Sequence, residues 1–187
     1  MKANVVSGRQ KATIERHEET LMGLPVVLLN AAIQVEHGGE VGVVVPDVAA
    51  LEPAMALARV TVPTKLSGKE ILFLRKALGL KAVDLAKFLD VTPETFSRWE
   101  NGAVPISTNP ERILRLRVMH ALRGRAPGVP AKDEDILNLS FSPVRSAAAP
   151  VTLVFERARV VKDGRSQEVW CFLETEKHPA KTVLRIA

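Results

Sequence analysis

The sequence has no tyrosine and only one cysteine, and aromatic residues make up 4% of its 187 positions. A single thiol, Cys171, cannot close an internal disulfide or supply a cysteine-rich zinc site, so both are excluded. A chain without disulfides suits a reducing compartment, and we therefore expect a cytoplasmic protein. Because rings are so scarce, its cores must be built mainly from Val, Leu, Ile and Ala.

Long apolar runs and enzyme signatures are missing as well. The longest apolar stretch, Leu21 to Ile33, is interrupted by Gly23, Pro25 and Asn30 and is too short to cross a bilayer. The polar N-terminus lacks the apolar segment of a secretion signal. There is no glycine-rich phosphate loop and no Gly-x-Ser-x-Gly elbow, and the 4 histidines are scattered. We expect no membrane segment, no cofactor, no metal and no enzymatic activity.

Positive charge is concentrated in one part of the chain. Residues 63–125 contain 12 Lys and Arg against 6 Asp and Glu, whereas the other residues contain 14 against 15. Binding of a basic segment to the phosphate backbone of a nucleic acid is favourable, because each neutralised phosphate releases counterions. This distribution is also compatible with a merely basic helical surface, so it does not by itself identify a partner.

The basic segment has the local signals of four helices. Ser67 and Glu70 have the spacing of a capping box, so a first helix should begin at Ser67 and end at Gly79. A second helix is predicted over residues 82–89. Thr92 as N-cap and Pro93 at the first helical position begin a third helix that runs to residue 101. A fourth helix is predicted from about residue 110 to residue 123.

The second and third helices have the composition of a helix-turn-helix. Such a pair needs a small residue where the helices touch and an apolar residue in the turn, which Ala86 and Val91 supply. The third helix needs buried anchors, for which Phe96 and Trp99 are suited. The opposite face of this helix is polar, with Glu94, Thr95, Ser97 and Arg98.

These residues resemble the Cro/repressor (Xre-type) helix-turn-helix family over about one third of the chain. The likeness lies in the runs Leu74 to Leu80, Asp84 to Ala86, Leu89 to Thr92 and Ser97 to Gly102. Within that family, Glu70 to Lys76 and Phe96 to Glu100 are most similar to MqsA-type antitoxins.

The resemblance implies roles for individual residues. Arg75 and Glu100 should form a buried structural ion pair, and Glu94 and Arg98 fall on the positions that read bases. Glu94 stands where the family often has Asn or Gln, so it either accepts from cytosine or simply faces solvent. Contacts with the DNA backbone are implied for Lys81, Thr92, Thr95, Ser97 and Asn101.

The flanking regions are less regular. In residues 1–62 we predict a loose arm or short helix over 1–20 and a helix over 48–58. Between them, β-type runs are predicted from residue 24 to residue 46, with turns at Asn30 and Gly38-Gly39. In residues 126–187 we predict a linker, a short helix near 133–137, a β-hairpin over 151–173 with its turn at Asp163-Gly164, and a last strand over 182–186.

MqsA-type relatives carry a zinc domain ahead of the helix-turn-helix. Here Val35 and Gly38 stand where its cysteines would be, so the resemblance implies no structural zinc. His37, beside Glu36 and Glu40, could be a weak metal site, although a solvated turn histidine is the simpler interpretation.

The C-terminal hairpin admits several interpretations. Trp170 and Phe172 share one strand face, which favours core packing or a dimer contact over a toxin-binding surface or a ligand sensor. Cys171 lies on the other face with no visible activating base, so we expect it to be inert.

Taken together, the sequence predicts an α+β protein. A central all-α, four- to five-helix domain of Xre type (63–125) is flanked by a small N-terminal α+β unit (1–62) and a C-terminal β-hairpin region (126–187). The predicted function is that of a sequence-specific transcriptional regulator, a homodimeric repressor that reads a palindrome in double-stranded DNA. An alternative is an antitoxin-like interaction module that binds a toxin partner and autoregulates its operon.

Overall fold

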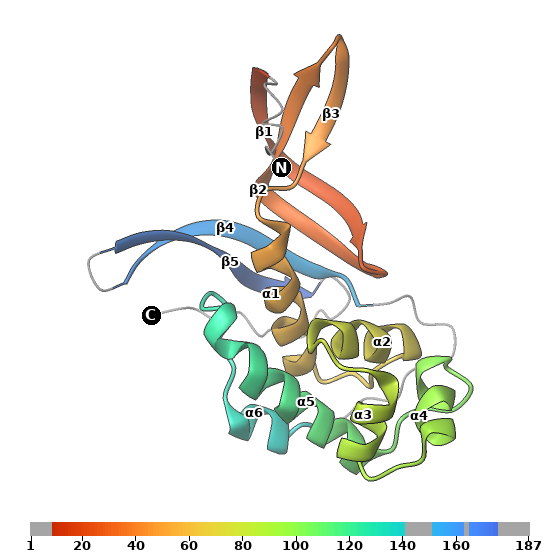
Figure 1. Ribbon diagram of the computed structural model, residues 1–187. Helices are drawn as coiled ribbons and strands as arrows, with labels where there is room; N and C mark the ends of the chain where they lie inside the picture. The colour runs from red at the N-terminus through yellow and green to blue at the C-terminus, as the bar shows by residue number, and fades with distance from the viewer. Residues whose placement is uncertain (1–8, 141–150, 163–164, 176–187) are drawn as a thin grey trace, which may run out of the picture.

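The computed structural model describes residues 9–140, 151–162 and 165–175 (Figure 1). These residues form six α-helices, a short 3₁₀ helix and one five-stranded sheet. The strands are β1 (Arg9–Leu21), β2 (Leu24–His37), β3 (Glu40–Val44), β4 (Leu153–Lys162) and β5 (Arg165–Thr175). The helices are α1 (Val48–Thr61), α2 (Gly68–Ala77), α3 (Ala82–Phe88), α4 (Pro93–Glu100), α5 (Thr108–Leu122), the 3₁₀ helix η1 (Arg123–Arg125) and α6 (Asp133–Leu137).

The sheet joins the two ends of the described chain. Strand β2 is antiparallel to β1 along its length and to β3 over residues 33–37. Residues 26–29 of β2 also pair in parallel with residues 153–156 of β4, which in turn pairs with β5. The sequence suggested two separate flanking regions, but the structure places both in one sheet. Parallel pairing between segments so far apart leaves no local sequence signal.

Two sequence predictions in the N-terminal region were wrong. Residues 9–21 form β1 rather than a loose arm or helix, and the many charges of this strand are tolerated because most of its described side chains face solvent. Asn30 does not make a turn between strands. It lies inside β2 with a positive φ of 50°, opposite a register shift in β1 between Ile14 and Arg16. This is a β-bulge, which bends a strand without ending it.

Other predicted elements were confirmed. Gly38 and Gly39 turn the chain between β2 and β3 with φ values of 60° and 85°. Helix α1 begins at the predicted residue and extends to Thr61, and α6 spans 133–137 as predicted. The hairpin of β4 and β5 is present, whereas its turn at Asp163-Gly164 and the predicted strand over 182–186 lie outside the described residues. None of the described helices has both the length and the apolarity needed to cross a membrane.

Helix α1 connects the sheet to the helical domain. One end lies beneath the sheet and the other runs down to α2 and α5 (Figure 1). Its residues from Pro53 to Val60 are all buried, and most are small or aliphatic, as a helix enclosed on all sides requires. Trp170 of β5 fixes its start, because the indole Nε1 donates to the backbone oxygen of Asp47, the N-cap of α1, at 3.1 Å.

Four buried charged side chains link α1, α2 and α5. Arg59 of α1 donates through Nε and Nη2 to the carboxylate of Glu70 on α2. Burial by itself raises the pKa of Glu70. The positive charge of Arg59 and the hydrogen bonds from Arg59 and Ser67 outweigh this effect of burial and hold the pKa below its usual value. Glu70 therefore stays ionised at neutral pH.

Arg115 and Glu111 of α5 complete this network, and both are 0% exposed. Arg115 Nη2 lies 2.8 Å from Glu111 Oε1, and its guanidinium also donates to the backbone oxygens of residues 60, 62 and 64 at 2.6–2.8 Å. Burial, followed by the charge of Arg59, lowers the pKa of Arg115 to about 10, so it remains protonated at neutral pH. The segment between α1 and α2 is thus held by two arginines.

Candidate nucleic-acid interface

Helix α2 begins and ends where its local signals predicted. The Ser67 hydroxyl accepts from the amide of Glu70 at 3.4 Å, and the Glu70 carboxylate accepts from the amide of Ser67 at 2.7 Å, which completes the capping box. Gly79, just beyond the helix, has a φ of 67°, the left-handed conformation that ends many helices. These contacts fix α2 as the support against which α4 packs, and α3 packs in turn against α4.

Helices α3 and α4 form the predicted helix-turn-helix. The Thr92 hydroxyl caps α4 by accepting from the amide of Thr95 at 3.2 Å, with Pro93 at the first helical position. Leu85, Ala86 and Leu89 are buried between the helices, and Val91 of the turn is half-buried against the same core. Each sequence requirement for this motif is therefore met in the structure.

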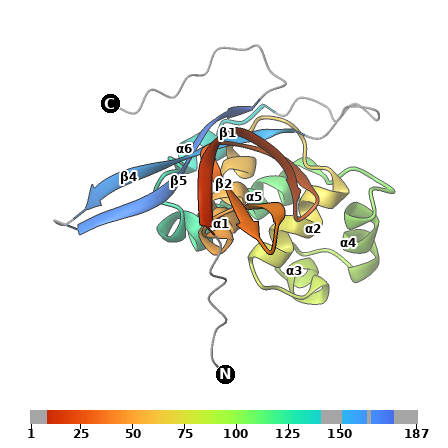
Figure 2. The same cartoon turned by 90° about the horizontal axis from the view of Figure 1, so that it is seen from above.

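Helix α4 has one buried face and one exposed face. Phe96 and Trp99 are buried and meet edge-to-face, with ring centroids 6.3 Å apart and planes at 70°. Glu94, Ser97 and Arg98 are exposed on the other side. Figures 1 and 2 both place α4 at the outer end of the helical domain, away from the sheet. The exposed face of α4 is therefore accessible to an extended partner.

The structure brings the predicted DNA-contacting residues onto or beside α4. Glu94 and Arg98 are four residues apart and so occupy neighbouring positions on the exposed face. Of the remaining predicted residues, Thr92 and Asn101 cap the two ends of α4, Thr95 and Ser97 lie within it, and Lys81 stands at the start of α3. The exposed Thr92 bonds the half-buried Thr95, Ser97 accepts from Asn101 Nδ2 at 3.3 Å, and Lys81 is the exposed N-cap residue of α3. Their contacts with DNA stay predictions.

Arg75 and Glu100 join α2 to the last residue of α4. Arg75 Nε lies 2.7 Å from Glu100 Oε1, and Nη2 lies 3.4 Å from Oε2, while Nη1 donates to the backbone oxygen of Leu80 at 2.9 Å. The two side chains are 16% and 12% exposed, so the pair is partly rather than fully buried. It fixes the end of the candidate recognition helix.

Replacing Arg75 with methionine should lower the free energy of unfolding by about 1–3 kcal/mol, because Glu100 and the Leu80 oxygen would lose their donors. Urea denaturation monitored by circular dichroism would measure this. Lys76→Met, a change of the exposed neighbouring cation, serves as the matched control and should have little effect. Equal stability of the two variants would show that the pair contributes nothing.

Gly68 is a second link between α2 and α4, one that the sequence pattern did not single out. A Cβ at this position would lie 2.4 Å from the backbone oxygen of Glu100 and 2.7 Å from that of Trp99. No side chain fits there without moving one helix away from the other. In the sequence, the only sign of this close approach is a glycine immediately after an N-cap. Because many residues are tolerated at that position, the glycine does not by itself indicate a tight contact.

Gly68→Ala should therefore destabilise the domain by roughly 1–3 kcal/mol, the usual range for overpacking. Thermal unfolding would measure the change. Gly124→Ala is the matched control, since a Cβ there meets nothing within 4 Å. If Gly68→Ala melts at the wild-type temperature, the close approach of the two helices is not a constraint.

The surface of residues 63–125, all of which the structure describes, remains basic after buried charges are removed. Arg115, which the sequence count included in the positive excess, is buried and cannot face a partner. In this segment, 8 Lys and Arg against 3 Asp and Glu are exposed. The basic residues are Lys69, Lys76, Lys81, Lys87, Arg98, Arg117, Arg123 and Arg125.

Residues 71–117, from α2 through most of α5, match a family model described as helix-turn-helix. The prediction of a DNA-binding helix-turn-helix of Xre type is confirmed for this segment. No curated protein and no solved structure matches the chain. The nearer likeness to MqsA-type antitoxins stays a prediction. Among the described residues, no group of three or more His, Cys, Asp and Glu is placed to hold a metal ion.

Proposed function

We propose that this protein is a transcriptional repressor that inserts α4 into the major groove of DNA and reads base pairs with Arg98 and Glu94. The observation that supports this most is the arrangement of α4. Its polar face stands exposed at the outer end of a basic domain, while Phe96 and Trp99 anchor its other face. A helix held in this way can present fixed side chains to base edges.

Each proposed contact follows from the chemistry of its side chain. The planar guanidinium of Arg98 matches the O6 and N7 acceptors of guanine, and such a bidentate contact is worth about 1–3 kcal/mol of discrimination. The carboxylate of Glu94 can accept from the N4 amine of cytosine. Lys81, Thr92, Thr95, Ser97 and Asn101 would contact phosphates and set the register.

The proposal also covers the oligomeric state, the cellular location and the need for a cofactor. A repressor that reads a palindrome must be two-fold symmetric, so we propose a homodimer. To reach its operator it would act in the cytoplasm. We further propose that it is not an enzyme and needs no cofactor for binding DNA.

Selection of bound sequences from random DNA by the purified protein tests this function. We expect an enriched inverted repeat whose half-sites lie one helical turn, about 10 base pairs, or a multiple apart. Enrichment of a single asymmetric site would contradict the homodimer. Absence of any enriched sequence would contradict sequence-specific binding.

The alternative, an antitoxin-like module, is favoured by the three-stranded arm of β1, β2 and β3. Strand β3 pairs with β2, and no other described strand covers its outer edge. Val41, Val43 and Val44 of this strand are all exposed. Such an edge can accept a strand from a partner protein.

Co-expression with the product of a neighbouring small gene tests this alternative. A charge on the edge should block strand addition, so Val43→Lys should prevent co-purification while leaving operator binding unchanged. If the toxin-like product binds both forms equally, or binds neither, the β3 edge is not the partner site.

A further inference from the structure

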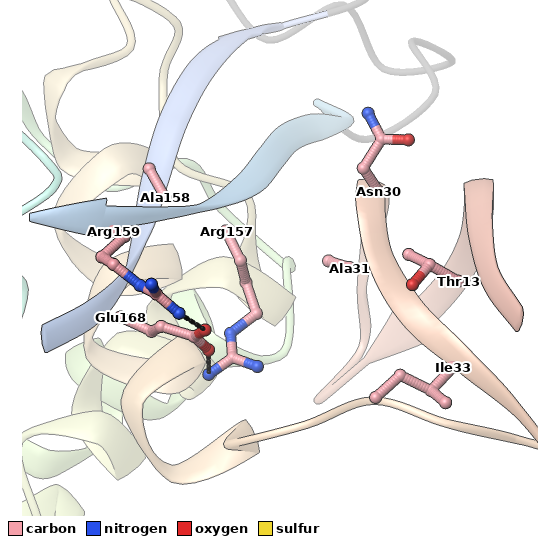
Figure 3. Close-up of a pocket in the computed structure, with 8 residues that line it drawn as sticks. All are labelled: Thr13, Asn30, Ala31, Ile33, Arg157, Ala158, Arg159 and Glu168. Carbon is pink, nitrogen blue, oxygen red and sulfur yellow. Dashed lines mark ion pairs between the residues drawn. The ribbon is translucent and has the colours of Figure 1, made fainter. Parts of the chain in front are cut away.

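A cleft opens in the sheet where β2 and β4 part. The two strands are paired over residues 26–29 and 153–156, and beyond these residues they diverge. The space between them has a volume of about 430 Å³, within the range of about 300–1,000 Å³ of small-molecule sites. Its lining includes Thr13, Ala31, Ile33, Arg157, Arg159 and Glu168, which come from β1, β2, β4 and β5 (Figure 3).

One wall of the cleft carries a surplus of positive charge. Arg157 Nη2 lies 2.7 Å from Glu168 Oε2, and Arg159 Nη2 lies 3.8 Å from Glu168 Oε1. Two guanidinium groups thus share one carboxylate. The side chain of Arg159 is 73% exposed and its ion pair is long, so Arg159 can turn toward a ligand at little cost.

Arg157 also has an unused donor. Its Nε is buried and has no hydrogen-bond partner among the described residues. Figure 3 shows its guanidinium between Glu168 on one side and Ala31 and Ile33 of β2 on the other. A buried donor without an acceptor is unfavourable, and a small movement of the Arg157 side chain toward a ligand oxygen would give Nε an acceptor.

The opposite wall, formed by β1 and β2, has both apolar and polar residues. Ala31 is buried and Ile33 is half-buried, whereas Thr13 and Asn30 are exposed. A ligand that fills the cleft should therefore have one acidic group for the arginines and an apolar body for β2. Glu168 would repel a second negative charge, which favours monoanions over phosphates and dicarboxylates.

We propose that this cleft binds a small monocarboxylate with a short apolar body. The ionised carboxylate accepts hydrogen bonds from Arg157 and Arg159, and the body of the ligand packs on Ala31 and Ile33. This site is separate from α4 and does not depend on the proposed DNA-binding function.

The cleft adjoins a natural reporter group. The guanidinium of Arg157 lies over the ring of Trp170, 5.6 Å from its centroid, and the indole of Trp170 donates to the Asp47 oxygen at the start of α1. A carboxylate bound to Arg157 changes the charge above this ring. The other tryptophan, Trp99, lies in the helical domain and serves as an internal control.

Nuclear magnetic resonance of the ¹⁵N-labelled full chain tests the proposal, with hexanoate and benzoate as probes. We expect a saturable shift of the Trp170 indole signal and no shift for Trp99. Hexanol and inorganic phosphate, at matched ionic strength, should leave both signals in place. Assignment of the two signals comes from a Trp170→Phe variant.

Variants of Arg157 test whether this side chain binds the carboxylate. Arg157→Gln should weaken binding of the carboxylate at least tenfold, and Arg157→Lys, which keeps the charge but loses the Nε donor, should give a smaller loss. Arg123→Gln, which removes the same charge from an exposed position outside the cleft, should bind as the wild type does. An unchanged Trp99 signal shows that the helical domain of each variant is folded, and an unchanged far-ultraviolet circular dichroism spectrum shows the same for the sheet. The proposal is overturned if neither acid gives a saturable Trp170 shift, or if Arg157→Gln binds as tightly as the wild type.

Discussion

Replacing Arg115 with methionine is expected to lower the free energy of unfolding by about 3–5 kcal/mol, the typical cost of removing one partner from a buried ionic network. Among the described residues, the change would leave Glu111 with Lys65 as its remaining ion-pair partner, at 3.4 Å from its Oε2. The backbone oxygens of Val60, Val62 and Thr64 would each lose one donor, and of these only those of Val62 and Thr64 keep Arg59 as a second donor. A loss of this size is a large fraction of the stability of an ordinary domain.

Denaturant unfolding followed by far-ultraviolet circular dichroism would measure this loss. Arg123→Met, at the exposed C-cap position just after α5, is the matched control and should change stability by less than about 0.5 kcal/mol. If Arg115→Met unfolds at the same denaturant concentration as Arg123→Met, the buried network does not hold the helical domain to α1.

Replacing Arg98 with alanine is expected to remove most of the discrimination between operator and scrambled DNA. Loss of a bidentate contact with guanine costs about 1–3 kcal/mol per site, or roughly fivefold to more than a hundredfold in relative affinity. In a two-fold complex the loss occurs twice. The exposed position of Arg98 makes an effect on folding small, because no described side chain depends on it.

Fluorescence anisotropy titrations of both DNA fragments would measure this effect. Lys81→Ala is the informative comparison, since a phosphate contact should weaken binding to both fragments equally and reduce the salt dependence. An Arg98→Ala variant that still prefers the operator by the wild-type ratio would remove Arg98 from the reading surface.

The helical domain could be predicted from the sequence because its signals are local. A capping box at Ser67 and an N-cap followed by Pro93 each fix a helix start through contacts within a few residues. The buried anchors Phe96 and Trp99 follow from helical spacing alone. The candidate reading face of α4 is then what remains exposed.

The sheet could be predicted only in part, because its pairing is not local. Nothing near residues 26–29 indicates that residues 153–156 will be their neighbours. The cleft at which these strands part could not be predicted, because it depends on that pairing and on the bulge at Asn30. The hairpin residues alone left ligand sensing as one interpretation among several.

The buried network was missed although the sequence contained a signal for it. Glu111 and Arg115 occupy the same helical stripe as Leu114, Val118 and Leu122, all of which are buried. Charged residues four apart on an apolar stripe indicate a buried pair rather than a solvated face. The sequence-based charge balance of residues 63–125 therefore included Arg115, although its position on the apolar stripe indicates burial.

The most direct test of the central claim is protection of guanine N7 from dimethyl sulfate, because N7 lies in the major groove. On the selected operator, the wild-type protein should protect at least one guanine in each half-site, and Arg98→Ala should leave those guanines reactive at saturating concentration. Protection confined to adenine N3, in the minor groove, or unchanged guanine protection by Arg98→Ala, would contradict the account.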